Sequence, residues 1–241
     1  MRHSLEITIP VLNEERTLEQ QVRRTHAFLH TLERAAPAGL VIADNGSTDA
    51  TPRLARLLAE ELPGVRYLRL EERGVGRALK AAWSTSDAHI VGSMDLDLST
   101  DLQHLPAALA LLDAGQADIV AGSRLARGAR VTNRTPLRTL TSVGFNTIVR
   151  VLFRTRFTDG MCGFKFLRRG IVPDLIQAGA CSDGWFFETE VLIAGEYLGY
   201  AVRDLPVVWT DDPDTKVRVV PLALEYLRAM WRLRGRLPRR R

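Results

Sequence analysis

Short apolar segments alternate with amphipathic segments through the first half of the chain. Five segments are apolar, short and bounded by polar or turn-forming residues, which predicts β-strands at 5–11, 40–44, 65–70, 89–94 and 118–121. The gaps between them carry the apolar spacing of helices, at 15–33, 53–62, 75–85 and 102–113. Because parallel neighbouring strands need right-handed helical crossovers, this order predicts an α/β fold whose mostly parallel sheet has helices on both faces.

The second half of the chain is less regular. Its patterns predict helices at 136–153, 170–178 and 187–199, a strand at 200–207, and a last helix that begins near Pro221, a residue type that suits a first helical turn. No Pro/Gly-rich linker or internal repeat interrupts the first half. We therefore expect one domain over residues 1–218, followed by a basic amphipathic helix and tail over 219–241.

Net charge is concentrated at the C-terminal end. The chain has 241 residues and a formal charge of +5, with 33 basic and 28 acidic residues. Seven of the basic residues are arginines from Arg228 onward, so residues 1–227 hold 26 basic against 28 acidic side chains. A nucleic-acid binder would spread its basic residues over one face, and this distribution argues against that class. A basic tail beside apolar residues suits an anionic membrane surface, or is simply solvated.

The last helix combines the two kinds of residue. Arg228, Arg232 and Arg236 recur every four residues and so lie along one side of the helix. The apolar residues form two adjacent stripes, one of Leu224, Leu227 and Trp231 and one of Met230, Leu233 and Leu237. This pattern is typical of a helix that lies in a membrane interface, and the alternative is a helix packed on the core with solvated arginines.

Neither a membrane span nor a signal peptide is predicted. The longest apolar run, 105–112, is far shorter than the roughly eighteen residues that indicate a spanning helix. The N-terminus enters a strand-like segment almost at once. Cys162 and Cys181 make neither a disulfide framework nor a zinc pattern and are expected to be reduced packing residues. We expect a cytoplasmic protein that lies peripherally at the inner face of the membrane.

Polar clusters follow three of the predicted strands. They are PVLNEE at 10–15, DNGSTD at 44–49 and DLD at 95–97. In open α/β sheets, ligands bind beyond the carboxyl ends of the strands, which is where these clusters fall. The sequence therefore predicts a ligand site at this edge.

Asp95 and Asp97 carry the most specific chemistry. Their period-two spacing at a strand end points both carboxylates in the same general direction. An isolated Asp-x-Asp is more often a turn, but its place beside the other clusters favours a hard cation, Mg²⁺ or Mn²⁺, held together with substrate phosphates. Asp44 is placed to accept hydrogen bonds from a ribose or base, whereas residues 47–52 are typical helix caps.

A glycine-containing segment, GVGRA at 74–78, precedes a predicted helix. Its amides could contact a phosphate at the helix N-terminus, or the segment could be only a helix-start turn, since it lacks the third glycine of a dinucleotide fingerprint. Arg77 and Lys80 are candidate donor contacts on the first interpretation.

Taken together, the motifs resemble the family 2 glycosyltransferases of the GT-A fold, especially the dolichyl- and polyprenyl-phosphate glucosyl- and mannosyltransferases. The resemblance runs nearly end to end, through 10–15, 44–49, MDLDLS at 94–99, GSR at 122–124, DGMCGFK at 159–165 and WFFETE at 185–190. The chain departs from the family pattern at Leu12, where an aromatic is frequent, and at Asn45, where a second aspartate is usual. The resemblance implies a GT-A, Rossmann-like sheet, with a nucleotide-sugar half at about 1–125 and an acceptor half at about 126–218.

The resemblance also implies roles for particular residues. The donor-binding set is Pro10, Leu12, Glu14, Asp44, Arg77, Lys80, Asp95, Leu96 and Asp97, with Asp95 and Asp97 as metal ligands. The acceptor-phosphate set is Arg124, Arg138, Ser142 and Lys216, and the catalytic set is Asp97, Asp159 and Arg124. Arg127, Arg130 and Arg134 share no single face and are interpreted as a solvated basic loop. Glu188 and Glu190 are left without a defined role.

The expected reaction is inverting, metal-dependent transfer of a hexose from a nucleotide sugar to a polyprenyl or dolichyl phosphate. UDP-glucose is the preferred donor and GDP-mannose the next. Further expected partners are an anionic membrane surface and a membrane partner subunit, with no nucleic acid. One alternative is a soluble glycan, natural-product or protein hydroxyl acceptor, which would need a general base such as Asp159 or Glu190. Another is a catalytically silent nucleotide-sugar binding module.

Overall fold

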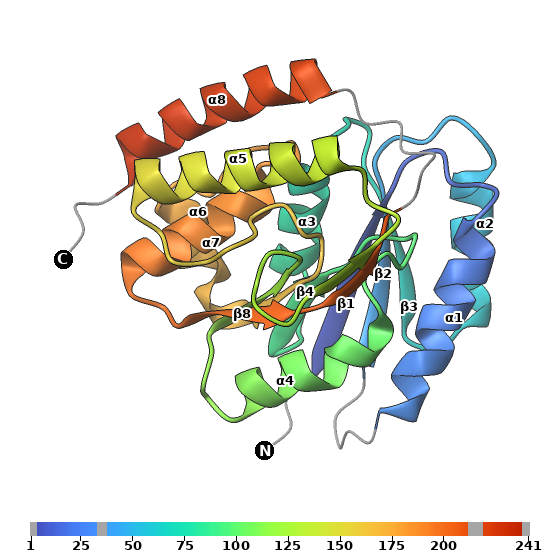
Figure 1. Cartoon of the computed structure of the whole chain (residues 1–241). Coiled ribbons are helices and arrows are strands. Elements are labelled where there is room, and N and C mark those ends of the chain that lie inside the picture. Colours follow the sequence, from blue (N-terminus) through green and yellow to red (C-terminus); the bar gives the residue numbers. More distant parts are fainter. Residues whose placement is uncertain (1–3, 33–37, 212–218, 238–241) are drawn as a thin grey trace.

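A seven-stranded sheet forms the centre of the molecule, which a computed structural model describes over residues 4–32, 38–211 and 219–237 (Figure 1). Its strand order is β3-β2-β1-β4-β7-β5-β8, and a separate pair joins β6 and β9. The strands are β1 (Leu5–Val11), β2 (Ala38–Asp44), β3 (Val65–Arg69), β4 (Ile90–Ser93), β5 (Ile119–Ser123), β6 (Arg130–Thr132), β7 (Lys165–Arg168), β8 (Val202–Pro206) and β9 (Val208–Thr210). Every pairing is parallel except those of β7 with β4 and β5.

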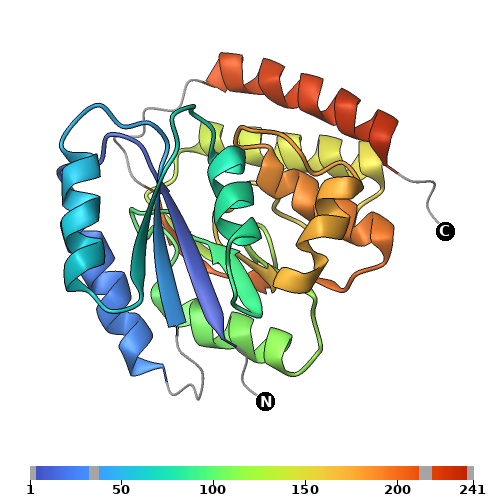
Figure 2. The same ribbon diagram turned by 180° about the vertical axis from the view of Figure 1, so that it is seen from behind.

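Helices cover both faces of this sheet, as the two opposite views show (Figures 1 and 2). They are α1 (Leu18–Thr31), α2 (Thr51–Glu61), α3 (Val75–Ser84), α4 (Leu105–Asp113), α5 (Pro136–Phe153), α6 (Val172–Gln177), α7 (Phe187–Leu198) and α8 (Val219–Arg236). Short 3₁₀ turns, Leu102–His104 and Arg169–Ile171, precede α4 and α6. The mostly parallel α/β fold predicted from the sequence is confirmed.

Each face of the sheet has its own hydrophobic cluster. Successive residues of β2 alternate between the two, with Leu40 and Ile42 in one and Val41 and Ala43 in the other, because side chains along a strand point to opposite faces. The first cluster packs under α1, α2 and α4, and the second under α3, α5, α6, α7 and α8. The strands are buried on both faces, so they form nearly continuous apolar runs in the sequence.

The sequence patterns located most elements and missed three strands. All five predicted first-half strands are present with ends that differ by at most two residues, and the predicted strand at 200–207 is β8. The last helix begins at Val219, two residues before Pro221. The missed strands β6, β7 and β9 have only three or four residues each, too few to show a period.

The missed strand β7 decides what lies at the carboxyl ends of its neighbours. It runs antiparallel between β4 and β5, so its first residue, Lys165, pairs with Ser93 and Ala121 near the ends of those strands. The segment 159–164, which leads into β7, therefore lies at the same edge of the sheet as Asp95. Close packing of β4 on β7 leaves no room for a side chain at Gly92, where a Cβ would lie 2.2 Å from the Phe166 ring.

We expect Gly92→Ala to lower the free energy of unfolding by about 1–3 kcal/mol, because the added methyl would also lie 2.7 Å from the backbone oxygen of Lys165. Gly144→Ala is the matched control, since Gly144 lies inside α5 and a Cβ there meets nothing within 4 Å. It should raise the free energy of unfolding by about 0.5–1 kcal/mol. Urea unfolding of both variants measures the difference, and a Gly92→Ala variant as stable as wild type would contradict the close approach of β4 and β7.

Candidate active site

The loops that follow β1 and β2 are joined into one rim by mutual hydrogen bonds. The backbone N–H of Asn13 donates to Ser47 Oγ (2.9 Å), and the N–H of Thr48 donates to Asn13 Oδ1 (2.8 Å). The N–H of Glu14 donates to Thr51 Oγ1 (2.8 Å). Asn13 has φ +56°, a left-handed conformation that asparagine tolerates better than most residues. The rim holds Pro10 and Glu14 half-buried and leaves Leu12 37% exposed.

Asp44 anchors this rim from below. Its Oδ1 accepts the N–H of Ser47 (2.8 Å), and its Oδ2 accepts Tyr67 Oη–H (2.8 Å) and Arg69 Nη1–H (2.8 Å). The side chain has no exposed surface. Its predicted contact with a nucleoside stays a prediction, and the contacts in the structure are to the protein itself. Sequence reasoning missed Tyr67 and Arg69, whose positions on β3 carry no motif.

The N-terminus of α3 is covered by the loop 181–184. The N–H of Gly76 donates to the carbonyl of Gly184 (3.2 Å), and the N–H of Arg77 donates to the carbonyl of Asp183 (3.2 Å). A Cβ on Gly76 would lie 2.3 Å from the Ser182 carbonyl, so the glycine permits this approach. These two amides thus donate to carbonyls of the protein itself, as the helix-start interpretation expects, and the phosphate contact stays a prediction.

The side chains on α3 are paired with the same loop. Arg77 Nη2 lies 3.0 Å from Asp183 Oδ2, and Lys80 Nζ lies 2.8 Å from Asp183 Oδ1. Arg77 also pairs with Glu72, and Lys80 donates to the carbonyl of Cys181 (2.7 Å). These contacts clamp the loop 181–184 onto α3. The donor-binding role of Arg77 and Lys80 stays a prediction.

Asp95 and Asp97 lie at the end of β4, with Asp95 half-buried and Asp97 exposed. Burial, together with the negative charges of Asp97 and Glu188, raises the pKa of Asp95 to about 7. The Asp95 carboxylate packs directly on Gly163, where a Cβ would lie 2.3 Å from Oδ2. Asp97 Oδ1 accepts the N–H of Ser99 (2.8 Å). Two crowded carboxylates of this kind fit a divalent cation.

The donor set around this pair includes one buried apolar residue. The Leu96 side chain is 7% exposed and belongs to the hydrophobic cluster under α1, α2 and α4, so any contact with a donor would come from its backbone. Among the described residues, no group of three or more His, Cys, Asp or Glu side chains could hold a metal ion. A cation held by Asp95 and Asp97 would therefore complete its coordination with water or with a ligand's own oxygens.

Arg124 and Asp159 form a buried bidentate ion pair. Arg124 Nε and Nη2 donate to the two carboxylate oxygens of Asp159 (2.7 and 2.9 Å), and the Arg124 N–H donates to Oδ2 (3.1 Å). Burial opposes ionisation of Asp159, but the Arg124 guanidinium outweighs it and holds the pKa of Asp159 below its ordinary value. On its other side, the guanidinium lies 4.7 Å from the centre of the Trp209 ring. Asp159 thus orients Arg124.

Two further arginines lie beside this pair. Arg134 is 10% exposed, and its Nε and Nη1 have no hydrogen-bond partner within the described part of the chain. Arg138 Nη1 lies 3.4 Å from Asp211 Oδ2, and Arg134 Nε lies 3.9 Å from the same oxygen. Burial and the nearby positive charge of Arg124 lower the pKa of Arg134. We call Arg124, Arg134 and Arg138 the arginine cluster.

Sequence reasoning placed Arg134 in a solvated loop, together with Arg127 and Arg130. Those two residues are exposed, but Arg134 is turned inward next to the start of α5, where Thr135 caps the helix by accepting the N–H of Arg138 (3.3 Å). The cap at Thr135 predicts where α5 begins, but no signal in the sequence shows that Arg134 is buried. Ser142, one turn beyond Arg138, is 4% exposed with a hydroxyl that has no partner. Lys216 lies outside the described residues.

Glu188 and Glu190 have different surroundings at the start of α7. Glu190 Oε2 accepts the N–H groups of Cys181 and Ser182 (2.8 and 2.7 Å), and its Oε1 accepts Ser182 Oγ–H (2.5 Å). Burial raises the pKa of Glu190. Glu188 Oε1 accepts Ser93 Oγ–H (2.5 Å) and so faces β4 and Asp95. Glu190 orders the loop 181–184, whereas Glu188 lies on the Asp95 side of the site.

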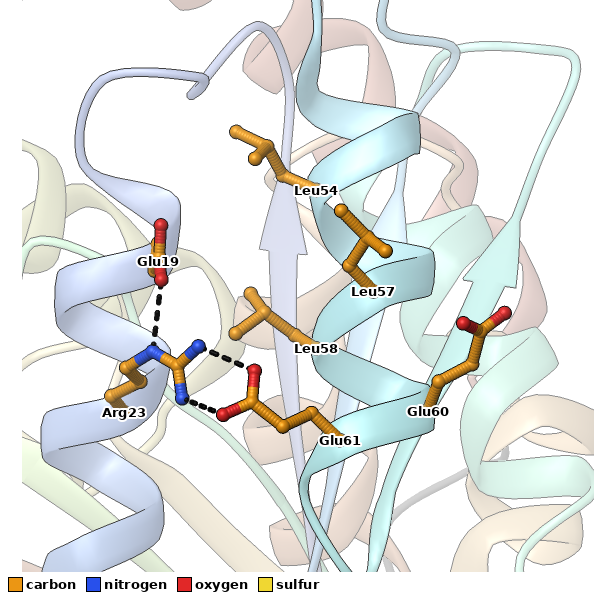
Figure 3. Close-up of a pocket in the computed structure, with 7 residues that line it drawn as sticks. All are labelled: Glu19, Arg23, Leu54, Leu57, Leu58, Glu60 and Glu61. Carbon is orange, nitrogen blue, oxygen red and sulfur yellow. Dashed lines mark hydrogen bonds and ion pairs between the residues drawn. The ribbon is translucent and has the colours of Figure 1, made fainter.

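A groove between α1 and α2 does not contain any of these residues. It is lined by Glu19, Arg23, Leu54, Leu57, Leu58, Glu60 and Glu61, and Figure 3 shows the Arg23 guanidinium joined to both Glu19 and Glu61. The pair of Arg23 with Glu61 joins α1 to α2 across this groove.

A mostly parallel sheet with one reversed strand, carrying Asp-Leu-Asp at the end of β4, defines a glycosyltransferase of the GT-A type. The chain belongs to glycosyl transferase family 2, whose family model matches residues 6–176. The solved structure of glucosyl-3-phosphoglycerate synthase from Mycobacterium tuberculosis, in complex with Mn²⁺, UDP-glucose and phosphoglyceric acid, has the same fold, with a TM-score of 0.69 at 17% identity over 98% of this chain and 81% of that chain.

Two curated relatives match nearly the whole chain. Glycosyltransferase AglD of Haloferax volcanii is 33% identical over 97% of this chain, which spans 38% of that longer protein. The dolichyl-phosphate beta-glucosyltransferase of Homo sapiens is 26% identical over 95% of this chain and 78% of its own length. The family predicted from the sequence motifs is confirmed.

We expect Asp97→Ala to abolish glycosyl transfer without lowering the free energy of unfolding by more than about 1 kcal/mol. The exposed carboxylate makes one backbone hydrogen bond, to Ser99, and its removal relieves repulsion on Asp95. Glu60→Ala, another exposed carboxylate in the groove of Figure 3, is the control and should retain transfer. Transfer assays with divalent metal, together with urea unfolding, test both. Near-normal turnover of Asp97→Ala would show that the metal-site assignment is wrong.

Proposed function

We propose that this chain transfers a hexose from a nucleotide sugar to a polyprenyl phosphate such as dolichyl phosphate. The observation that carries the proposal is the arginine cluster, in which Arg134 is nine-tenths buried and has two nitrogens without a hydrogen-bond partner among the described residues. Buried donors of this kind are costly unless a ligand satisfies them, and a guanidinium matches the oxygens of a phosphate. The relatives named for dolichyl-phosphate glucosyl transfer support the same acceptor and favour glucose, with UDP-glucose as donor and GDP-mannose as the next candidate.

The donor side of the proposed site is the edge formed by the rim and the end of β4. Pro10, Leu12 and Glu14 lie on the rim, which Asp44 holds in place, and they would contact the nucleoside. Asp95 and Asp97 would hold Mg²⁺ or Mn²⁺ together with the diphosphate, because two carboxylates leave positions for substrate oxygens. When bound, the ion offsets negative charge on the departing nucleoside diphosphate.

The acceptor side needs orientation more than proton transfer. A phosphate monoester carries about −1.5 to −2 charges at neutral pH and is already a nucleophile. Arg124, held by Asp159, and Arg134 and Arg138 would position it and screen its charge. An alcohol acceptor would need a general base, but the Asp159 carboxylate is bound by Arg124 and the Glu190 carboxylate by residues 181 and 182. Because both carboxylates are already occupied by these hydrogen bonds, a phosphate acceptor is favoured over a soluble alcohol acceptor.

The proposed chemistry is a single displacement. The acceptor phosphate oxygen attacks the anomeric carbon, the bond from that carbon to the donor diphosphate breaks, and the nucleoside diphosphate leaves with the bonding electrons. One displacement inverts the anomeric configuration. The chain's own contribution is to hold the two phosphate groups on opposite sides of the sugar, at the arginine cluster and at Asp95 and Asp97.

We expect wild type to use a short water-soluble prenyl phosphate as acceptor. The Arg134→Gln change should raise the KM for this acceptor by roughly tenfold or more, because charge-assisted hydrogen bonds to the phosphate are lost. The KM for the nucleotide sugar should change little. Steady-state kinetics with UDP-glucose measure both constants.

Arg130→Gln is the control for charge, because Arg130 is exposed and four residues away.

The inverted anomeric configuration of the product is checked by coupling constants. Transfer to alcohols but not to any prenyl phosphate would favour the soluble-acceptor alternative. Tight donor binding with neither transfer nor donor hydrolysis would favour the silent module.

Apolar residues on α5 and α8 form an exposed surface suited to a membrane. On α8, Tyr226, Ala229, Met230 and Leu233 are buried in the core, whereas Leu227 and Trp231 are 54% and 81% exposed. One face of this helix therefore packs on the core, and another face exposes apolar residues that would be available to a membrane. On α5, the residues exposed to solvent include Leu137, Leu140, Val143, Ile148 and Val151. Among the described residues, no helix is long and apolar enough to cross a bilayer.

The two helices lie side by side in both views (Figures 1 and 2). The Phe145 and Tyr226 rings are 5.2 Å apart, and Arg234 Nη1 donates to the carbonyl of Leu152 (2.6 Å). Successive residues of an α-helix are rotated by about 100° around its axis, so Leu227 and Trp231 lie on the same side of α8 as Arg234. Because Arg234 contacts α5, this side of α8 is next to α5. The opposite, inward side of α5 carries Arg138 and Ser142. A membrane against this surface would bring the lipid phosphate near the arginine cluster, and α5 has no acidic residue to oppose anionic lipids.

We expect the protein to cosediment with anionic liposomes at low salt, and the triple change of Arg228, Arg232 and Arg236 to Gln to weaken binding without unfolding the protein. Each basic residue near an anionic bilayer contributes about 1 kcal/mol, so three changes should reduce partitioning by roughly a hundredfold. Higher salt should weaken wild-type binding through screening.

A matched control changes Arg16, Arg24 and Arg53 to Gln, which removes the same charge from exposed positions in or beside α1 and α2. This control should bind liposomes nearly as well as wild type. If wild type ignores anionic liposomes at low salt, recruitment to the membrane depends on a partner subunit.

A further inference from the structure

Lys165 is a fully buried lysine at the carboxyl edge of the sheet. Its side chain is 1% exposed, and it is the first residue of β7, paired in register with Ser93 of β4. Its ammonium group donates to the carbonyl of Cys162, in the loop that carries Gly163. Burying an ammonium group is costly unless opposite charge and hydrogen-bond acceptors compensate it. The carboxylates near Lys165 are therefore the groups that compensate its charge.

Glu188 is the nearest carboxylate to this lysine. Its Oε1 lies 4.0 Å from Lys165 Nζ and accepts the hydroxyl of Ser93 at 2.5 Å. Lys165 of β7 and Glu188 of α7 thus meet beside Ser93, the last residue of β4, which precedes Asp95 by two residues. Neither residue was given a role by sequence reasoning.

Asp95 is the third charged group at this point. It packs on Gly163, which lies between the Cys162 carbonyl held by Lys165 and Lys165 itself. The charge of Glu188 acts on Asp95 in the same sense as Asp97, and the charge of Lys165 acts in the opposite sense. Counted as ionised groups, Asp95, Asp97 and Glu188 carry −3, and Lys165 reduces the total to −2. Arg124 also acts on Asp95, but its charge is compensated by its ion pair with Asp159. One divalent cation would neutralise that remainder.

We propose that Lys165 and Glu188 are a positioning pair for the carboxylates at the end of β4. Lys165 holds the 162–163 backbone against Asp95 and supplies a fixed positive charge, and the balance of the two residues sets how strongly the site attracts a divalent cation. This inference rests on the metal site of the proposed function.

A double-mutant cycle of Lys165→Met, Glu188→Gln and the double variant tests the pair. Two quantities are measured on the full chain: the Tm without metal, and the Kd for Mn²⁺ with saturating UDP, from the electron paramagnetic resonance signal of free Mn²⁺. Removing one partner leaves the other as an uncompensated buried charge, whereas removing both does not. Each single variant should therefore melt below the double variant.

The Mn²⁺ affinities should move in opposite directions in the two single variants. Lys165→Met makes the site more negative by one charge and should tighten Mn²⁺ binding by roughly fivefold or more, whereas Glu188→Gln should weaken it by a similar factor. The double variant restores the total charge and should return to within about twofold of wild type. If Lys165→Met does not fold, the opposition between Glu188→Gln and the double variant still carries the test.

A purely structural role would lower the Tm values and leave the Mn²⁺ affinities equal across the cycle. That result overturns the positioning pair and leaves the proposed function intact. If wild type binds no Mn²⁺ even with UDP present, both the metal site and the inference that rests on it are wrong.

Discussion

The packing of Asp95 on the backbone at Gly163 is the contact on which the arrangement of the site depends. It requires a strand that runs backward between β4 and β5, because only then does the segment before that strand reach the carboxyl edge of the sheet. It also requires a residue without a side chain, since a Cβ at Gly163 would lie 2.3 Å from the Asp95 carboxylate. The segment 159–165 consequently supplies three features at once: Asp159 for Arg124, Gly163 for Asp95, and Lys165 for Glu188.

Charge compensation then divides the site into two parts. On the acceptor side, Asp159 is fully engaged by Arg124, and Asp211 is shared at 3.4 and 3.9 Å by Arg138 and Arg134. Among the described residues, three arginines lie beside two aspartates there, and Arg134 keeps two buried nitrogens without a hydrogen-bond partner. On the metal side, three carboxylates face one lysine, which leaves an excess of negative charge. One part suits a phosphate and the other suits a divalent cation, as the proposed reaction requires.

Helix α5 connects this chemistry with the surface of the molecule. Its inward side holds Arg138 and Ser142, and its outward side exposes Leu140 and Val151, which are 69% and 75% exposed. A contiguous patch of exposed apolar residues usually marks a protein or membrane interface, because contact with a partner removes the patch from water. If Arg138 and Ser142 bind phosphate as proposed, α5 has one side for the phosphate head and one side for the hydrocarbon chain of the acceptor.

The sequence by itself determined the alternation of strands and helices, the carboxyl-edge location of residues 10–15, 44–49 and 95–97, and the family. Those features are local, since apolar periodicity and strand-end polarity are set by neighbours in the chain. Only the tertiary structure decided which charges are free. Arg134 and Arg130 are equivalent in sequence, yet one is buried beside Arg124 and the other is exposed. Asp159 and Glu190 were candidate bases until their partners, 35 and 8 residues away at Arg124 and Ser182, were seen. Burial and ion pairing depend on contacts between segments distant in sequence, such as β7 between β4 and β5, and no local pattern encodes them.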